Sequence, residues 1–155
     1  MEAGILEQRD HHKASPRTKD MSTNKQILQE AFAGTARGDG RAFVGMLADE
    51  VRWHIIGTTD WSETYEGKDS VINDLLRPLA DNFAGSNIVE ATRFVGEGDT
   101  IAVEGRNLSV TKRGPAYPNR YCWIFRMAAG RVIEVTEYCD TALIERVLVR
   151  PPREA

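Results

Sequence analysis

A carboxylate in the stretch EYCDT, residues 137–141, is the first candidate for chemistry, because it directly follows an apolar run. Side chains alternate between the two faces of a strand, so Ile133, Val135 and Glu137 share one face. This face is the more apolar one, and we therefore expect Glu137 to point into the protein. Burial raises the pKa of a carboxyl group toward neutrality, where a general base works best. The alternative is structural: Glu137 hydrogen-bonds Tyr121 or a backbone amide and only holds the sheet together.

The preceding stretch carries large side chains at every second position: Tyr121, Trp123, Phe125 and Met127. The joint AAG, residues 128–130, suits a type I turn closed by a glycine bulge. That turn pairs Phe125 with Ile133, Trp123 with Val135 and Tyr121 with Glu137. The sequence therefore predicts a phenol beside the carboxylate, at one end of an aromatic surface.

His54 is a further candidate for proton transfer, because an imidazole has a natural pKa near ~6.5. Alternation along residues 50–57 turns Val51, Trp53 and Ile55 inward, which leaves His54 outside. A cavity position and an exposed or structurally bonded position both stay open for this side chain.

Aromatic and amide side chains form the candidate substrate-binding set: Trp53, Trp61, Tyr65, Trp123 and Asn107. The aromatic rings could stack on a flat or apolar ligand, and the amide could hydrogen-bond it. Taken singly, each ring is also a normal core residue, and the amide could simply sit at a sheet end. The sequence shows no metal-ligand cluster, phosphate loop or Ser/His/Asp order, so we expect no cofactor and no metal.

The elements that must position these residues follow from hydrophobic periodicity and turn signals. A first helix is expected to begin at Thr23, which caps it together with Gln26 in a capping box. A second helix is expected at 41–47, and a third at 68–83 with a kink at Pro78. Strands are expected at 50–57, 87–95, 100–111, 120–128 and 131–139, and Asp140 caps a last helix. The predicted class is α+β, a curved antiparallel sheet wrapped by three helices into a cone with a pocket.

Length and composition fit one domain, residues 22–149, between a flexible tail at 1–21 and a short tail at 150–155. The net charge of −3 is spread without a basic stripe, which argues against nucleic acid as a partner. No stretch is long and apolar enough for a membrane span or a signal peptide, so we expect a cytoplasmic protein. The two cysteines, Cys122 and Cys139, lie on different strand faces, which predicts no disulfide.

Four stretches, VRWHIIGTTDW, YEGKDSV, NRYCWIF and GRVIEVTEYCDTAL, resemble the SnoaL-like group of the nuclear transport factor 2-like superfamily. They resemble most closely the bacterial proteins labelled ketosteroid isomerase-related. The resemblance covers residues 24 to 148. It implies a cone-shaped α+β barrel, a homodimer, and a pocket between the sheet and the helices.

Glu137 resembles the last-strand acid that activates water in limonene epoxide hydrolase-like members, with Glu in place of Asp. Those enzymes also carry an Arg and an Asp two apart, where this chain has Gly105 and Asn107, so the resemblance implies no complete triad. Aligned on Gly57, the proton-shuttling Asp of the ketosteroid isomerases falls at or next to His54.

These observations predict a cofactor-independent general acid/base enzyme of isomerase, lyase or hydrolase type. Glu137 would act with Tyr121 or His54 on a small apolar or aromatic molecule. The alternative is a non-catalytic dimer of the same fold, which binds a small ligand or fills its pocket with side chains.

Overall fold

The computed structural model describes residues 16–152, with side chains from residue 23 onward. The first helix, α1, runs from Pro16 to Thr35, so Thr23 lies inside it and the predicted cap at Thr23 is wrong. Of the predicted tail at 1–21, residues 1–15 lie outside the described residues, and 16–21 belong to α1. The apolar face of α1 packs into the core, where Leu28, Ala31 and Phe32 are all buried.

The other helices are short. Helix α2 spans Arg41–Gly45, and the predicted third helix is a composite of α3 (Lys68–Ser70), a π-helical segment η1 (Val71–Leu76) and α4 (Arg77–Ala80). The irregular turn directly precedes Pro78, whose ring displaces the backbone of the preceding turn. Helix α5 spans Thr141–Val147, and the Asp140 side chain accepts a hydrogen bond from the Leu143 amide, as predicted for its cap.

Six strands form one curved, open sheet: β1 (Leu47–Ile55), β2 (Thr64–Glu66), β3 (Val89–Glu97), β4 (Thr100–Asn107), β5 (Arg120–Ala128) and β6 (Arg131–Cys139). Their order is β2-β1-β6-β5-β4-β3. Strands β3 to β6 make the predicted antiparallel meander, whereas β1 joins β6 in parallel and pairs with β2 in antiparallel fashion.

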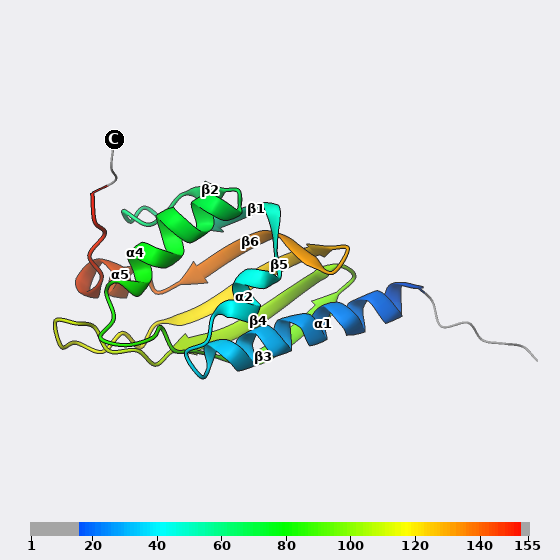
Figure 1. Cartoon of the computed structure of the whole chain (residues 1–155), viewed down its shortest axis with the longest axis horizontal. Helices are drawn as coiled ribbons and strands as arrows, with labels where there is room; N and C mark the ends of the chain where they lie inside the picture. The colour runs from blue at the N-terminus through cyan, green and yellow to red at the C-terminus, as the bar shows by residue number, and fades with distance from the viewer. Residues whose placement is uncertain (1–15, 153–155) are drawn as a thin grey trace, which may run out of the picture.

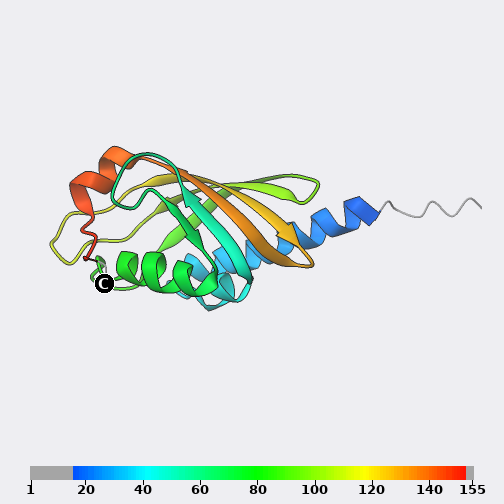
Figure 2. The ribbon, with the colours of Figure 1, turned by 90° about the horizontal axis from the view of Figure 1, so that it is seen from above.

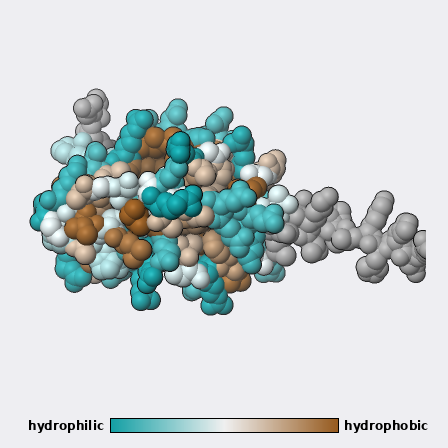
Figure 3. All heavy atoms as spheres, turned by 60° about the horizontal axis from the view of Figure 1, so that its bottom comes forward, coloured by the Kyte–Doolittle hydropathy of each residue, from teal (hydrophilic) through white to brown (hydrophobic). Residues whose placement is uncertain are grey.

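The helices α1, α2 and the α3–α4 segment lie on the same side of the sheet, and α5 lies at one end (Figures 1 and 2). The predicted α+β class is therefore confirmed. The inward side chains of the strands and the apolar faces of these helices form one core. On the face drawn in Figure 3, apolar residues stand in small groups among hydrophilic ones. Within the described part of the chain, no helix combines the length and the apolar character that crossing a bilayer requires.

The β5–β6 hairpin differs in register from the prediction. Its loop has two residues, Ala129 and Gly130, with φ angles of 50° and 75°, as in a type I′ turn. A bulge follows at Ile133, which lies between the paired positions of β6. Turn and bulge together shift the pairing by two residues, so Trp123 and not Tyr121 lies opposite Glu137. A shift of two keeps the face of each side chain, and for this reason Glu137 still points inward.

Candidate active site around Glu137

Glu137 is buried on the concave face of β6, with only 8% of its surface exposed. Trp53 of the neighbouring strand β1 donates a hydrogen bond from its indole Nε1 to Glu137 Oε2 at 3.0 Å. Trp123 lies directly opposite on the other neighbour, β5. The carboxyl group is therefore held between two indoles that belong to the adjacent strands.

Burial raises the pKa of Glu137 from 4.5 to about 7. Hydrogen bonds from Trp53, Trp123 and Cys139 act in the opposite direction, because they stabilise the carboxylate. Among the described residues, the ion pairs do not include Glu137, so no cation offsets the cost of burying its charge. Burial and the neighbouring carboxylate also raise the pKa of the Cys139 thiol to about 12. The site thus holds one acid that titrates near neutral pH.

A cavity of about 300 Å³ opens onto Glu137 between the sheet and the helices. Its buried floor carries Glu137, Trp53 and Trp123, and the exposed residues Gly40, Ala80 and Ser86 mark its mouth. The remaining lining is mostly apolar and comes from α1, α2 and the η1–α4 segment: Phe32, Phe43, Val44, Leu76 and Leu79. An apolar enclosure of this size with a few polar groups is typical of small-molecule sites.

A smaller cavity, of about 30 Å³, lies on the other side of the carboxyl group. Glu137, Trp53 and Tyr121 line both cavities, and Trp61 closes the small one together with Leu148 of the C-terminal segment. The predicted binding residue Trp61 therefore touches the small cavity and not the large one.

Tyr121 lines the cavity but does not partner the carboxyl group as predicted. Its ring stacks on Trp123, with centroids 4.5 Å apart and planes inclined by 13°. Burial, first of all, raises its pKa well above 10, and a hydrogen bond with Tyr117 adds to the shift. Tyr121 is therefore a neutral phenol. The two-residue shift in register places Cys139 instead of Glu137 opposite Tyr121, and its hydroxyl hydrogen-bonds the Tyr117 phenol instead.

His54 lies outside the cavity, which corrects its prediction as a catalytic residue. It is exposed on the convex face of β1, and its Nδ1 lies 2.9 Å from Thr64 Oγ1 on β2. The physical reason is the alternation of β1, which buries Val51, Trp53 and Ile55 and turns His54 to the opposite side.

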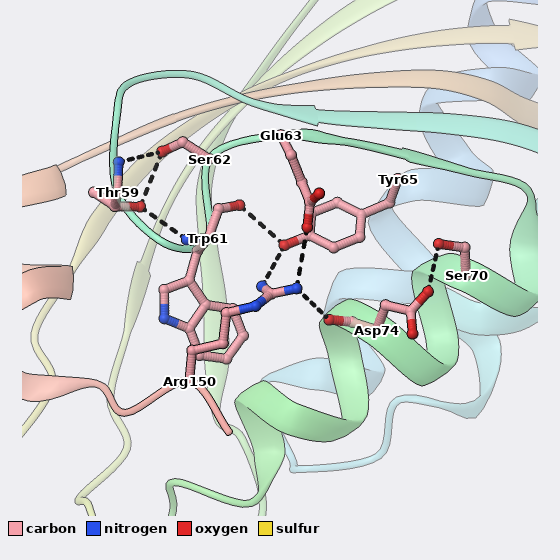
Figure 4. Close-up of polar contacts among 8 residues, drawn as sticks. All are labelled: Thr59, Trp61, Ser62, Glu63, Tyr65, Ser70, Asp74 and Arg150. Atoms are coloured by element: carbon pink, nitrogen blue, oxygen red, sulfur yellow. Dashed lines mark hydrogen bonds and ion pairs between the residues drawn. The ribbon is translucent and has the colours of Figure 1, made fainter. Parts of the chain in front are cut away.

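Tyr65 was also predicted to bind substrate, but it belongs to a separate cluster around Arg150 (Figure 4). Its hydroxyl donates to the Trp61 carbonyl oxygen at 3.0 Å and accepts from Arg150 Nη1 at 2.6 Å. Tyr65 lines neither the large nor the small cavity. Burial raises the pKa of its hydroxyl, so the group stays protonated.

Asn107 is 1% exposed and does not line the large cavity, so its predicted contact with a ligand is not found. Its Nδ2 instead donates to Asn87 Oδ1 at 2.7 Å, and Asn87 does line the cavity. Asn87 precedes β3 in a loop, and nothing in its local sequence distinguishes it from an ordinary turn residue. Asn87 is recognised as a site residue only from its tertiary contact with Asn107.

Gly105 explains how Trp123 fits into the cavity wall. A Cβ atom at this position would lie 2.8 Å from Trp123 Cζ3 and 2.7 Å from the Glu90 carbonyl oxygen. The neighbouring Arg106 lies on the exposed face, where it pairs with Glu90 at 2.8 Å. No arginine therefore approaches Glu137 from this strand, in agreement with the incomplete triad expected from the sequence.

The donor chemistry at Glu137 does not resemble a metal centre. Among the described residues, no three His, Cys, Asp or Glu side chains gather in a group that could hold a metal ion. The groups around Glu137 are indoles, phenols and one thiol, of which the indole N–H can only donate.

An open curved sheet with helices packed against one side defines the class of the fold, α+β. The SnoaL-like domain family matches residues 28–135, and the chain belongs to this family. No curated protein matches the chain.

Solved structures with the nuclear transport factor 2-like fold resemble the chain over most of its length. One is a protein of unknown function from Burkholderia pseudomallei, with 24% identity, a TM-score of 0.70, and coverage of 83% of this chain and 99% of that one. Bal32a, from a soil-derived mobile gene cassette, has 17% identity, a TM-score of 0.73 and coverage of 84% and 99%. TerC, co-crystallised with polyporic acid, has 18% identity, a TM-score of 0.69 and coverage of 81% and 97%. At these identities the likeness concerns the fold alone.

Proposed function

We propose that the protein is a cofactor-independent general acid/base catalyst that acts on a small, largely apolar molecule, with Glu137 as the base. The observation that carries the proposal is a buried carboxyl group without a cation partner, open to an apolar cavity of about 300 Å³. With a pKa of about 7, the group is ionised in part at neutral pH and can both take and return a proton. Tyr121, neutral and beside it, supports the cavity wall.

A binding module is the second candidate. The hydrogen bond from Trp53 and the donors Trp123 and Cys139 give Glu137 a ready structural role. The fold neighbour TerC was co-crystallised with polyporic acid, which is in keeping with a cavity that binds a small molecule. The two candidates differ in whether the carboxyl group removes a proton from what is bound.

The Kemp elimination of 5-nitrobenzisoxazole tests this difference without knowledge of the natural substrate. A base removes the proton from C3 of this flat apolar probe, the electron pair of the C–H bond forms the nitrile, and the N–O bond breaks to leave a phenolate. We expect the wild type to accelerate the reaction by about 100-fold or more over free carboxylate. The rate should rise with pH and level off above the Glu137 pKa of about 7.

Glu137→Gln should reduce the rate to background, because glutamine keeps the shape and accepts from Trp53 but removes no proton. Glu134→Gln is the matched control, since Glu134 lies on the same strand with its side chain 39% exposed and paired with Arg126. This control should keep the wild-type rate. Full turnover by Glu137→Gln would contradict the proposed function and favour the binding module.

The homodimer expected from the family resemblance stays a prediction. Sedimentation equilibrium of the purified chain would check it, with a mass of twice 17.3 kDa as the expected result and 17.3 kDa as the contrary one.

A further inference from the structure

Asn87 presents a hydrogen-bond donor to the cavity, at a point nearer the mouth than Glu137. The side chain lines the cavity and is half-buried, between the exposed mouth residue Ser86 and the buried floor. Its Oδ1 accepts hydrogen bonds from Asn107 Nδ2 at 2.7 Å and from Ser109 Oγ at 3.3 Å. Its Nδ2 has no hydrogen-bond partner among the residues that the structure describes.

The orientation of this amide follows from a relay that starts at the backbone. The Ser109 amide N–H can only donate, and it donates to Asn107 Oδ1 at 2.8 Å. The other end of Asn107 must therefore be its NH₂ group, which requires an oxygen as partner. That oxygen is Asn87 Oδ1, so the NH₂ group of Asn87 is the end that remains for a ligand.

Ser109 is compatible with the same orientation. Its hydroxyl oxygen accepts from the Ile88 amide at 2.8 Å, so the hydroxyl proton is free to donate to Asn87 Oδ1. Asn107 and Ser109 are buried, at 1% and 5% exposure, which shields the relay from competing water. A flipped Asn87 would set its NH₂ group against the NH₂ group of Asn107, and this is unfavourable.

We propose that Asn87 is a specificity-determining residue, which selects ligands that carry an acceptor oxygen, such as a carbonyl, toward the mouth of the cavity. The inference rests on the proposed function, because it uses the same cavity. The apolar walls between Asn87 and Glu137 hold the body of the ligand, and Asn107 and Ser109 act as positioning residues. A ligand oxygen at this point replaces the water that otherwise solvates the Asn87 NH₂ group.

The test compares two probes that differ only in this oxygen, 2-acetylnaphthalene and 2-ethylnaphthalene, by ligand-observed NMR titration. Asn87→Asp keeps Oδ1 for Asn107 and Ser109 but replaces the outward NH₂ group by an oxygen. We expect this variant to lower the ratio of ketone to hydrocarbon affinity by about tenfold, the value of one hydrogen bond of ordinary strength. The infrared carbonyl stretch of the bound ketone should move to higher frequency, because the hydrogen bond is lost.

Ala84→Asp is the control for the added charge, since Ala84 is exposed, lies three residues before Asn87 and does not line the cavity. It should keep the wild-type affinity ratio within about twofold, well below the effect of one hydrogen bond. An unchanged ratio and carbonyl frequency in Asn87→Asp, or an equal loss in Ala84→Asp, overturns the role of Asn87 while the cavity still binds. Failure of the wild type to bind either probe overturns this inference and the proposed function together.

Discussion

Two regions of the molecule bury a charged group among aromatic rings, and they treat it in opposite ways. The Arg150 side chain is 9% exposed and is fully compensated: it pairs with Glu63 at 3.0 Å, donates to Tyr65 and lies 4.8 Å over the Trp61 ring (Figure 4). Glu137 has hydrogen-bond donors but no cation among the described residues. The stability of the fold is a sufficient reason for the first arrangement. It gives no reason for the second, which lowers stability at neutral pH, and this cost supports the proposed function.

The backbone also contributes to the compensated region. Pro78 has no N–H to donate to the Asp74 carbonyl oxygen one turn earlier, and Arg150 Nη2 donates to that oxygen at 3.3 Å. Arg150, which was predicted to begin the C-terminal tail, thus joins the β1–β2 connection to the α3–α4 segment. At Glu137, by contrast, the space beside the charged group remains a cavity.

The largest effect should come from Glu137→Gln, and it should be a gain in stability. The pKa of Glu137 is raised from 4.5 to about 7, so the unfolded state loses this proton at lower pH than the folded state does. The unfolding free energy of the wild type therefore falls by about 3 kcal/mol between pH 4.5 and 7, at 1.36 kcal/mol per pKa unit, and stays constant above pH 7. The variant lacks this loss.

Urea unfolding of both proteins from pH 4 to 9 measures the gain. The difference in unfolding free energy should be small near pH 4, increase up to pH 7 and then stay constant. A variant that is less stable than wild type at every pH would mean that Glu137 is a structural hydrogen-bonding partner, and the contrast between the two regions would disappear.

Arg150→Ala should have the next largest effect, with the opposite sign. It removes the contacts to Glu63, Tyr65 and Asp74 and leaves the Glu63 carboxylate without this partner. Because the Glu63 side chain is 33% exposed and can regain water, we expect a loss of about 2 to 3 kcal/mol, at the lower end for a broken buried pair. Thermal unfolding at pH 7 checks this, and an unchanged melting temperature would show that the C-terminal segment adds nothing to the fold.

The smallest effect should come from Glu63→Gln. This substitution makes the same chemical change beside Arg150 as Glu137→Gln makes in the cavity. Glutamine still accepts from Arg150 but carries no charge, so we expect a loss of about 1 kcal/mol at pH 7. The same urea titration compares the two variants directly. Equal signs for the two substitutions would refute the distinction between a compensated and an uncompensated charge.

The fold and the inward direction of Glu137 could be predicted because both depend on alternation within single strands. The identity of its partner could not, since the hairpin register depends on Ala129 adopting a positive φ and on the bulge at Ile133. Neither residue is typical of such a position. The two-residue shift left the faces unchanged and replaced Tyr121 by Trp123.

The remaining site residues were beyond prediction because they depend on contacts between distant segments. Asn107 was predicted to contact a ligand directly, whereas its side chain donates to Asn87, 20 residues away in the chain. Arg150 stands in the stretch RPPREA, whose composition is that of a frayed end. Trp61 and Tyr65 were predicted to bind substrate because they are aromatic, whereas both rings lie under the Arg150 guanidinium group, and only Trp61 also lines the small cavity.

The most direct test of the account is the pKa of Glu137 itself. Carbon-13 NMR of protein labelled at the glutamate Cδ follows each carboxyl group through a pH titration, and the signal missing from Glu137→Gln identifies the one of interest. The account predicts a midpoint of about 7 for that signal. A midpoint near 4.5 would show that the buried carboxylate is stabilised as an ion, and it would contradict the claim that Glu137 is a strained acid available for proton transfer.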